Sequence, residues 1–259
     1  MLIAAGKTSY TDVRILKPIT ALRFNDFNPD SELRVQLVGQ SGSSVDIIPR
    51  SKLVDFMSIA NMYYGAYRRK VGEPGAVSYS GMVHLSRIAP NLNEMNFLQI
   101  SVYSATIQKT ENEIVGIESV SVGNQYQKYN RLFVPAGTGV SQFMLNGKSV
   151  IGLPKMEGVD YVINYSNGLS RNITQSELNA IGDCQSDLSS ICEFVTSPDT
   201  TLIAKNFIEG GQTPVVCLPC AETAYVGDVA PTMVSITINV DTTKVTGGYG
   251  FYALSTETF

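Results

Sequence analysis

The chain of 259 residues contains a single histidine, His84. Imidazole has an ordinary pKa near neutrality, so most hydrolytic and metal sites use histidine as a base or a ligand. No nucleophile or orienting carboxylate is marked near His84 in the sequence, so a catalytic triad is not indicated. His84 alternates in phase with Ser78, Ser80 and Ser86, which predicts a surface or interface position for its side chain. The sequence therefore predicts a protein that is not an enzyme.

The second group of side chains that could do chemistry is formed by four cysteines, at Cys184, Cys192, Cys217 and Cys220. Cys217 and Cys220 have the spacing of a zinc knuckle, whereas Cys184 and Cys192 are too far apart for a typical ligand pair. Free thiols, disulfides and a four-cysteine zinc site all remain open. A thioredoxin-like role is not indicated because no βαβ pattern surrounds the pair at 217 and 220. We expect no cofactor.

One compact basic run, Arg68-Arg69-Lys70, is a candidate binding segment. In one interpretation it is a solvated loop that follows a helix. In the other it contacts lipid headgroups or acidic neighbours, with about 1 kcal/mol for each charge near an anionic membrane. The sequence alone does not decide between them.

The composition limits the classes of partner. Charged residues make up 16% of the chain and the net charge is −4, whereas globular chains average roughly 25% charged residues. The chain as a whole is not strongly basic, so sequence-specific nucleic-acid binding is not expected. No apolar run approaches the ~18 residues of a membrane span, and no signal peptide is expected. Low charge with many tyrosines is compatible with large surfaces that meet other subunits.

The elements that must position these residues are mostly strands. Apolar and polar residues alternate in short runs such as 33–37, 98–102 and 234–240. Alternation with period two predicts half-buried antiparallel strands, because successive side chains point to opposite faces of a sheet. Asn146-Gly147 lies between two apolar runs and predicts a tight hairpin. Many short strands at this spacing predict a sandwich or a barrel.

Two segments have helical patterns instead. Residues 51–64 place apolar side chains at helical spacing, with Ser51 as a possible N-cap. Thr174 and Glu177 have the spacing of a capping box, and Gly182 is placed where the second helix should stop. Each helix has strands before and after it, so the chain contains two tandem copies of one plan. The predicted boundary gives domains at residues 1–123 and 124–259.

The order of elements in the first half points to a family. A strand pair at 13–24 and 33–39 is followed by a helix at 52–64, the basic run at 68–70 and a strand that opens at 75–78. This order resembles the major capsid proteins of membrane-containing icosahedral bacteriophages, the double jelly-roll lineage, and especially the corticovirus type. The second half is similar to them in its layout.

The resemblance implies an all-β fold of two tandem eight-stranded jelly rolls with short inserted helices. It implies a structural major capsid protein whose pseudo-hexagonal homotrimers tile an icosahedral shell over an internal membrane. The expected partners are the chain itself, neighbouring trimers, other virion proteins and the lipid membrane. The expected location is the virion capsid, assembled in the host cytoplasm. The alternative is a phage spike or a lectin-like receptor-binding β-sandwich, which would form trimers but no shells.

Overall fold

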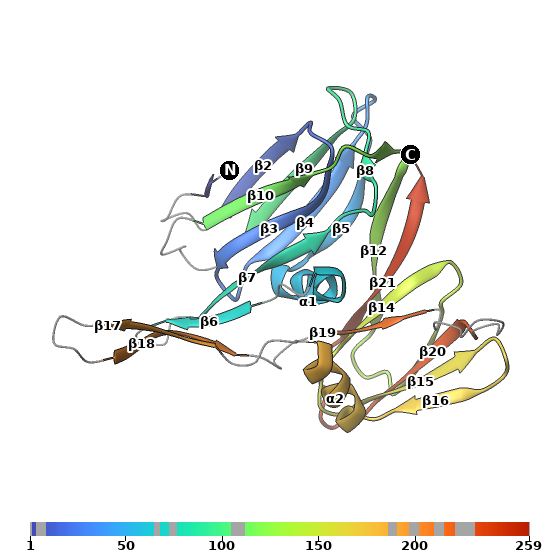
Figure 1. The fold of residues 1–259 in the computed structure, drawn as a ribbon. Coiled ribbons are helices and arrows are strands. Elements are labelled where there is room, and N and C mark those ends of the chain that lie inside the picture. The colour runs from blue at the N-terminus through green and yellow to red at the C-terminus, as the bar shows by residue number, and fades with distance from the viewer. Residues whose placement is uncertain are drawn as a thin grey trace, which may run out of the picture.

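The structure is a computed structural model. It describes residues 2–3, 9–64, 68–72, 77–104, 112–185, 191–196, 202–209, 215–220 and 231–258. In these residues the chain forms 21 strands and two helices, arranged in five sheets (Figure 1). The prediction of an all-β fold with short inserted helices is confirmed.

The first half of the chain contains two sheets. One is four-stranded, in the order β2 (Ser9–Ile15), β9 (Phe97–Tyr103), β4 (Glu32–Val38) and β5 (Ser44–Lys52). The other is seven-stranded, in the order β1 (Leu2–Ile3), β10 (Asn112–Glu118), β3 (Ile19–Phe27), β7 (Val77–His84), β6 (Arg68–Gly72), β18 (Leu202–Glu209) and β17 (Ile191–Thr196). A short parallel pair, β8 (Ala89–Pro90) and β11 (Val122–Gly123), leads into the second half.

Strand β4 follows the alternation predicted for it. Leu33, Val35 and Leu37 are buried, while the residues between them are partly exposed. On the exposed face Arg34 pairs with Asp46 of the neighbouring strand at 2.9 Å. The apolar face therefore turns toward the core and the polar face toward solvent, as period-two patterning requires.

The second half contains two four-stranded sheets. The first has the order β12 (Gln125–Val134), β21 (Tyr249–Thr258), β14 (Lys148–Pro154) and β19 (Val215–Pro219). The second has the order β13 (Val140–Met144), β20 (Met233–Val240), β15 (Val159–Tyr165) and β16 (Ser170–Ile173). Successive strands alternate between the sheets, except that β15 and β16 are neighbours in one sheet. The second-half core, which includes Tyr161, Ile236 and Phe251, contains side chains from both sheets.

The hairpin predicted at Asn146-Gly147 is wrong, although the turn itself is present. The amide of Lys148 donates to the carbonyl of Leu145 at 3.0 Å, and Gly147 has a positive φ of 72°. The flanking strands β13 and β14 belong to different sheets, and Leu145 donates its amide to Val234 at 2.8 Å. The turn therefore carries the chain across the sandwich, because β20 takes the place beside β13 that a hairpin partner would occupy.

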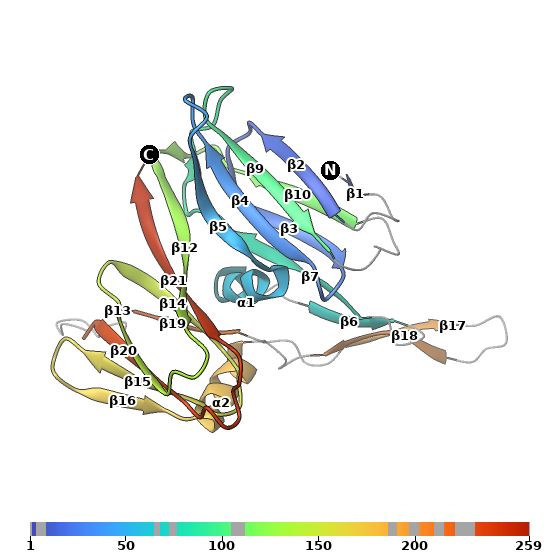
Figure 2. The same ribbon diagram turned by 180° about the vertical axis from the view of Figure 1, so that it is seen from behind.

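Helix α1 (Leu53–Tyr64) joins the two halves. It packs against β7 of the first half and β19 of the second, and it lies between the two halves in both views (Figures 1 and 2). One continuous hydrophobic core contains Phe56 of this helix together with Tyr129, Cys217 and Tyr252 of the second half. The helix therefore buries its apolar surface against both halves at once.

Helix α2 (Gln175–Gln185) begins with the predicted capping box. The amide of Glu177 donates to Thr174 Oγ1 at 3.3 Å, and the amide of Thr174 donates to Glu177 Oε2 at 3.1 Å. The predicted stop at Gly182 is wrong, because the helix continues to Gln185. A Cβ at Gly182 would lie 3.0 Å from Val216 Cγ2, so this glycine instead permits close packing of the helix on β19.

Replacing Thr174 by alanine is expected to cost about 1 kcal/mol of unfolding free energy, since it removes the acceptor for a helix N-terminal amide. Urea denaturation of the purified chain measures the loss. Ser176→Ala, an exposed change in the same helix turn, is the matched control and should change stability little. Equal losses in the two variants would contradict the capping role.

A hairpin of the second half extends the first-half sheet. Strand β18 pairs antiparallel with β6, and β17 pairs with β18. In both views these three strands form a ribbon that projects away from the packed sheets (Figures 1 and 2). The two halves are thus connected by strand pairing as well as by helix α1.

Candidate functional site

The basic run Arg68-Arg69-Lys70 forms most of strand β6. The interpretation of this run as a loop after the helix is wrong, because the run pairs with β7, the next strand in the chain, on one side and with β18, about 140 positions later, on the other. In the register, Arg69 lies opposite Glu209 of β18 and opposite Tyr79 of β7. The side chains of the run lie outside the described residues, so its binding role stays a prediction.

His84 is buried, with 3% of its surface exposed, so the surface position predicted for it is wrong. Strand β12 of the second half crosses the end of β7 at this point. The Tyr129 hydroxyl donates to the His84 carbonyl at 2.6 Å, and the Gln127 amide donates to the Leu85 carbonyl at 3.1 Å. Burial, with a smaller contribution from Arg87, lowers the pKa of His84 to about 4. The imidazole is therefore neutral at pH 7 and closed off from solvent.

A half-buried carboxyl group also lies between the two halves. Tyr252 of β21 donates its hydroxyl to Asp55 Oδ2 of helix α1 at 2.8 Å. Burial raises the pKa of Asp55, while the Tyr252 hydrogen bond and the charges of Lys52 and Arg131 oppose the shift. A carboxyl whose pKa is higher in the folded chain stabilises the fold most at low pH. That contribution is lost as the pH rises through the folded pKa.

Replacing Asp55 by asparagine is therefore expected to stabilise the chain relative to the natural protein as the pH rises. The amide oxygen of asparagine can still accept the Tyr252 hydroxyl, and it needs no buried charge. Melting temperatures measured from pH 4 to pH 8 test this, with the exposed Glu94→Gln variant as control. A difference between Asp55→Asn and the natural chain that shrinks with rising pH would contradict the expectation.

Two of the four cysteines, Cys217 and Cys220, can be described, and both are buried thiols outside any disulfide. Burial raises the pKa of Cys217 to about 12 and that of Cys220 to about 11, so both thiols are protonated at neutral pH. Cys217 lies in the core between the halves, where its Sγ is 3.7 Å from the Ile59 carbonyl oxygen. The side chains of Cys184 and Cys192 lie outside the described residues. Among those that are described, no three histidine, cysteine, aspartate or glutamate side chains are grouped to hold a metal ion.

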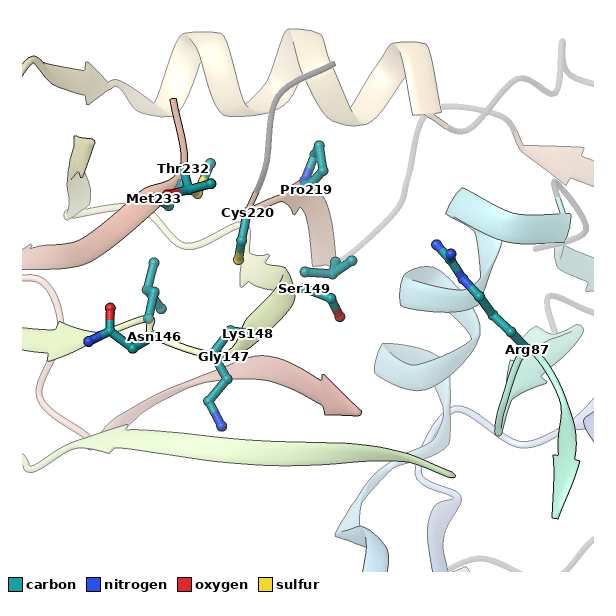
Figure 3. Close-up of a pocket in the computed structure, with 11 residues that line it drawn as sticks. Arg87, Asn146, Gly147, Lys148, Ser149, Pro219, Cys220, Thr232 and Met233 are labelled. Atoms are coloured by element: carbon teal, nitrogen blue, oxygen red, sulfur yellow. The ribbon is translucent and has the colours of Figure 1, made fainter. Parts of the chain in front are cut away.

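An open cleft of about 510 Å³ lies where the two halves meet. Arg87 approaches from the first half, and the turn at 145–150 and the segments at 219–220 and 232–233 line the other side (Figure 3). Arg87 is exposed and Lys148 is half-buried. Among the lining residues that the structure describes there is no carboxylate. We call this the basic cleft.

The arrangement of strands is shared with a solved coat protein. The chain has the fold of the major capsid protein P2 from Bacteriophage PM2. The two structures superpose with a TM-score of 0.50 over 100% of this chain and 98% of that one, at 8% sequence identity. At this identity the likeness concerns the fold alone, and it agrees with the capsid-like β architecture that the order of elements in the sequence predicted.

Two other solved structures are similar to a much smaller degree. The PBSX exported protein XepA covers 98% of this chain and 84% of its own, with 8% identity and a TM-score of 0.21. The protein YhaK from Escherichia coli covers 93% of this chain and 82% of its own, with 11% identity and a TM-score of 0.17. Both scores are too low for structural inference. No family model and no curated protein matches the sequence.

The catalytic possibilities raised by the sequence have no support in the described part of the chain. His84 and both described thiols are buried, so none of them faces the basic cleft as an ionised group. Within the described residues, neither helix is long and apolar enough to span a bilayer. The basic cleft was not predicted, because Arg87 and Lys148 are far apart in the sequence and neither belongs to a charged run.

Proposed function

We propose that the protein is a bacteriophage major capsid protein that assembles with copies of itself into the virion shell. The observation that carries the proposal is the fold shared with P2 of Bacteriophage PM2 across 100% of this chain and 98% of that protein. Agreement over the full length of both chains covers both halves and the connections between them. A coat subunit requires flat walls built from strands, and this architecture supplies them.

We also propose that each half is a jelly roll, with the boundary at residues 123 and 124. In the second half the orders β12-β21-β14-β19 and β13-β20-β15-β16 correspond to two interleaved Greek keys, as in a jelly roll. The order β2-β9-β4-β5 in the first half repeats the second of these patterns, and β1-β10-β3-β7 repeats the first. Strand β11 ends at Gly123 and β12 begins at Gln125, so the proposed boundary falls between elements.

Two similar lobes in one chain favour a homotrimer with a pseudo-hexagonal outline, which can tile an icosahedral shell. In this arrangement the chain acts by packing, and we propose no enzymatic activity and no cofactor. Its partners are further copies of the chain, other virion proteins and an internal membrane. Assembly takes place in the host cytoplasm, and the mature protein resides in the virion.

The test is the mass and shape of the assembled particle. Light scattering of the purified chain should give three times the chain mass of 28.1 kDa. Electron microscopy of concentrated protein or of the native source should show hexagonal tiles or closed shells. A stable monomer would overturn the proposal. A trimer that never forms larger structures would favour a receptor-binding spike instead.

The membrane contact needs a separate experiment. Flotation of the protein with anionic phosphatidylserine vesicles and with neutral phosphatidylcholine vesicles should recover it only with the anionic ones. Replacing Arg68, Arg69 and Lys70 together by glutamine should abolish that recovery, since each cation near the surface contributes about 1 kcal/mol. Undiminished flotation of the triple variant would remove this run from the membrane contact.

A further inference from the structure

Helices α1 and α2 occupy equivalent places in the two halves. Helix α1 follows β5 and packs against β7, while α2 follows β16 and packs against β19. Strands β7 and β19 end the matching orders β1-β10-β3-β7 and β12-β21-β14-β19. A Cβ at Gly81 of β7 would lie 3.2 Å from Met57 Cβ of α1. A Cβ at Gly182 of α2 would lie 3.0 Å from Val216 Cγ2 of β19. The two halves thus repeat one unit of sheets and helix.

In the second half, the face of this sheet that points away from the second-half core is covered. Successive residues of a strand point to opposite faces, so Cys217 points away from α2. Its Sγ lies 3.7 Å from the Ile59 carbonyl oxygen of α1. A Cβ at Gly152 of the neighbouring strand would lie 3.1 Å from Ile59 Cγ1, and Phe56 of α1 packs on Tyr252 in the same row. Strand β19 therefore has α2 on one face and α1 on the other (Figure 1).

The corresponding face of the first half is exposed at several described residues. Gly81 points to α1, so the next residue, Met82, points to the opposite face. Met82 lies in register with Arg23 of β3, and Arg23 with Val115 of β10. Arg23 is exposed, Met82 and Val115 are half-buried, and Ile117, two residues along β10, is 37% exposed. We call Arg23, Met82, Val115 and Ile117 the open sheet face.

Helix α2 also has one open side. Leu178 and Gly182 are buried against the second half. Ser176 and Ala180 are exposed, and because they are four residues apart they lie on one side of the helix. In α1 the side that points away from its own half covers the second-half sheet. One of two equivalent contacts between helix and sheet is therefore made inside the chain, and the two surfaces that would make the other are left open.

We propose that the outer side of α2 packs on the open sheet face of a second copy of this chain, and so repeats between copies the contact that α1 makes within one. The two surfaces differ, so the contact is heterologous, and it closes into a ring when the rotation between copies allows it. Both surfaces are sides of a lobe, so the lobes stand side by side, and three copies supply a ring of six. The proposal rests on the proposed function and deepens it, because it names the elements that join the subunits of the trimer.

The side chains of the two surfaces suit this contact. Met82, Val115 and Ile117 are apolar, so removing their remaining surface from water favours association. Ser176 and Ala180 are small, which lets α2 approach the sheet closely. The long side chain of the arginine in the middle of the open sheet face can lie along the sheet and keep its guanidinium group at the rim.

Enlarged or charged side chains on the two surfaces test the contact. Ala180→Arg places a long cation on the outer side of α2, and Ile117→Glu places a carboxylate on the open sheet face. The matched controls make the same substitutions at exposed residues outside both surfaces, Ala136→Arg in the turn between β12 and β13 and Val140→Glu in β13. Light scattering gives the mass of each, and thermal melting confirms that each is folded. Ala180→Arg and Ile117→Glu should fall from the trimer mass to the mass of one chain, while both controls should remain trimers.

Cysteine cross-linking tests which surfaces meet. A chain with both Met82→Cys and Ala180→Cys, treated with a flexible bismaleimide, should give covalent trimers on a denaturing gel, because every contact in the ring pairs one helix with one sheet face. Each single variant contains the same natural cysteines and should give no more cross-linking than the natural chain.

A folded Ala180→Arg or Ile117→Glu chain that remains trimeric would overturn the inference, and so would dissociation of either control. Covalent dimers from Ala180→Cys alone would overturn it as well, since helix would then meet helix. The absence of linked trimers from the double variant would have the same meaning. A natural chain that is monomeric contradicts the proposed function itself, whereas a trimer that fails these tests contradicts only this inference.

Discussion

Replacing Phe56 by alanine is expected to lower the free energy of unfolding by about 3–5 kcal/mol, the usual cost of deleting a buried phenyl ring from a packed core. Phe56 is 0% exposed in helix α1. Its ring centroid lies 5.4 Å from that of Tyr129 and 5.3 Å from that of Tyr252, both in edge-on geometry. These two tyrosines belong to β12 and β21, so the cavity would open between the halves.

Phe56→Ala should also show that the two halves unfold together. Because one core contains side chains of both halves, the natural chain should unfold in a single calorimetric transition, and Phe56→Ala should lower its midpoint without splitting it. Hydrogen exchange should become faster in β7 and in β21 together. Phe24→Ala is the matched control, because Phe24 is equally buried but packs on Phe27 within the first half. Faster exchange confined to the first half in both variants would contradict a shared core.

Features that depend on near neighbours in the sequence could be predicted. The capping box at Thr174 and Glu177 needs only residues three apart, and it forms as expected. The alternation in β4 likewise depends on the strand itself, since period two alone decides which side chains face the core. The order of elements also carried enough information to indicate a capsid-like β fold.

Features that depend on distant partners could not be predicted. Leu145 bonds to Val234 rather than to a hairpin partner, so the turn at Asn146-Gly147 joins two sheets. The outer edge of the strand that contains the basic run is paired with β18, about 140 positions later in the chain. Gly182 lies inside the helix rather than at its end, at a position where a larger residue would crowd Val216 of β19. In each case the deciding contact comes from more than thirty positions away, and period and spacing carry no information about it.

The same principle explains the candidate surfaces. Arg87 and Lys148 are single charges in unremarkable segments, and only the packing of one half on the other brings both to the edge of the basic cleft. A subunit that functions by packing has its important residues spread over its surface, whereas a catalytic site concentrates them in motifs.

Acidification from pH 7 to pH 5 is expected to remove about 2 kcal/mol of stability through His84 alone. Burial lowers the pKa of His84 from 6.5 to about 4 in the folded chain. The unfolded chain therefore takes up a proton on this residue at a higher pH than the folded chain does. The stability that neutral His84 contributes is fully present above its pKa in the unfolded chain. It falls as the pH drops toward its pKa in the folded chain. His84 is the only histidine, so replacing it removes the whole imidazole contribution, while Asp55 titrates equally in the natural chain and in the variant.

Urea unfolding of the natural chain and of His84→Gln at pH 7, 6 and 5 measures this contribution. Glutamine keeps a polar side chain at the junction of β7 and β12 but does not titrate. The absolute stability of the variant is not the test, since the substitution also changes packing. The expected result is a decline with falling pH that is smaller by about 2 kcal/mol in the variant. Parallel declines in the two proteins would show that His84 becomes protonated without unfolding, and that the second half does not seal it from solvent.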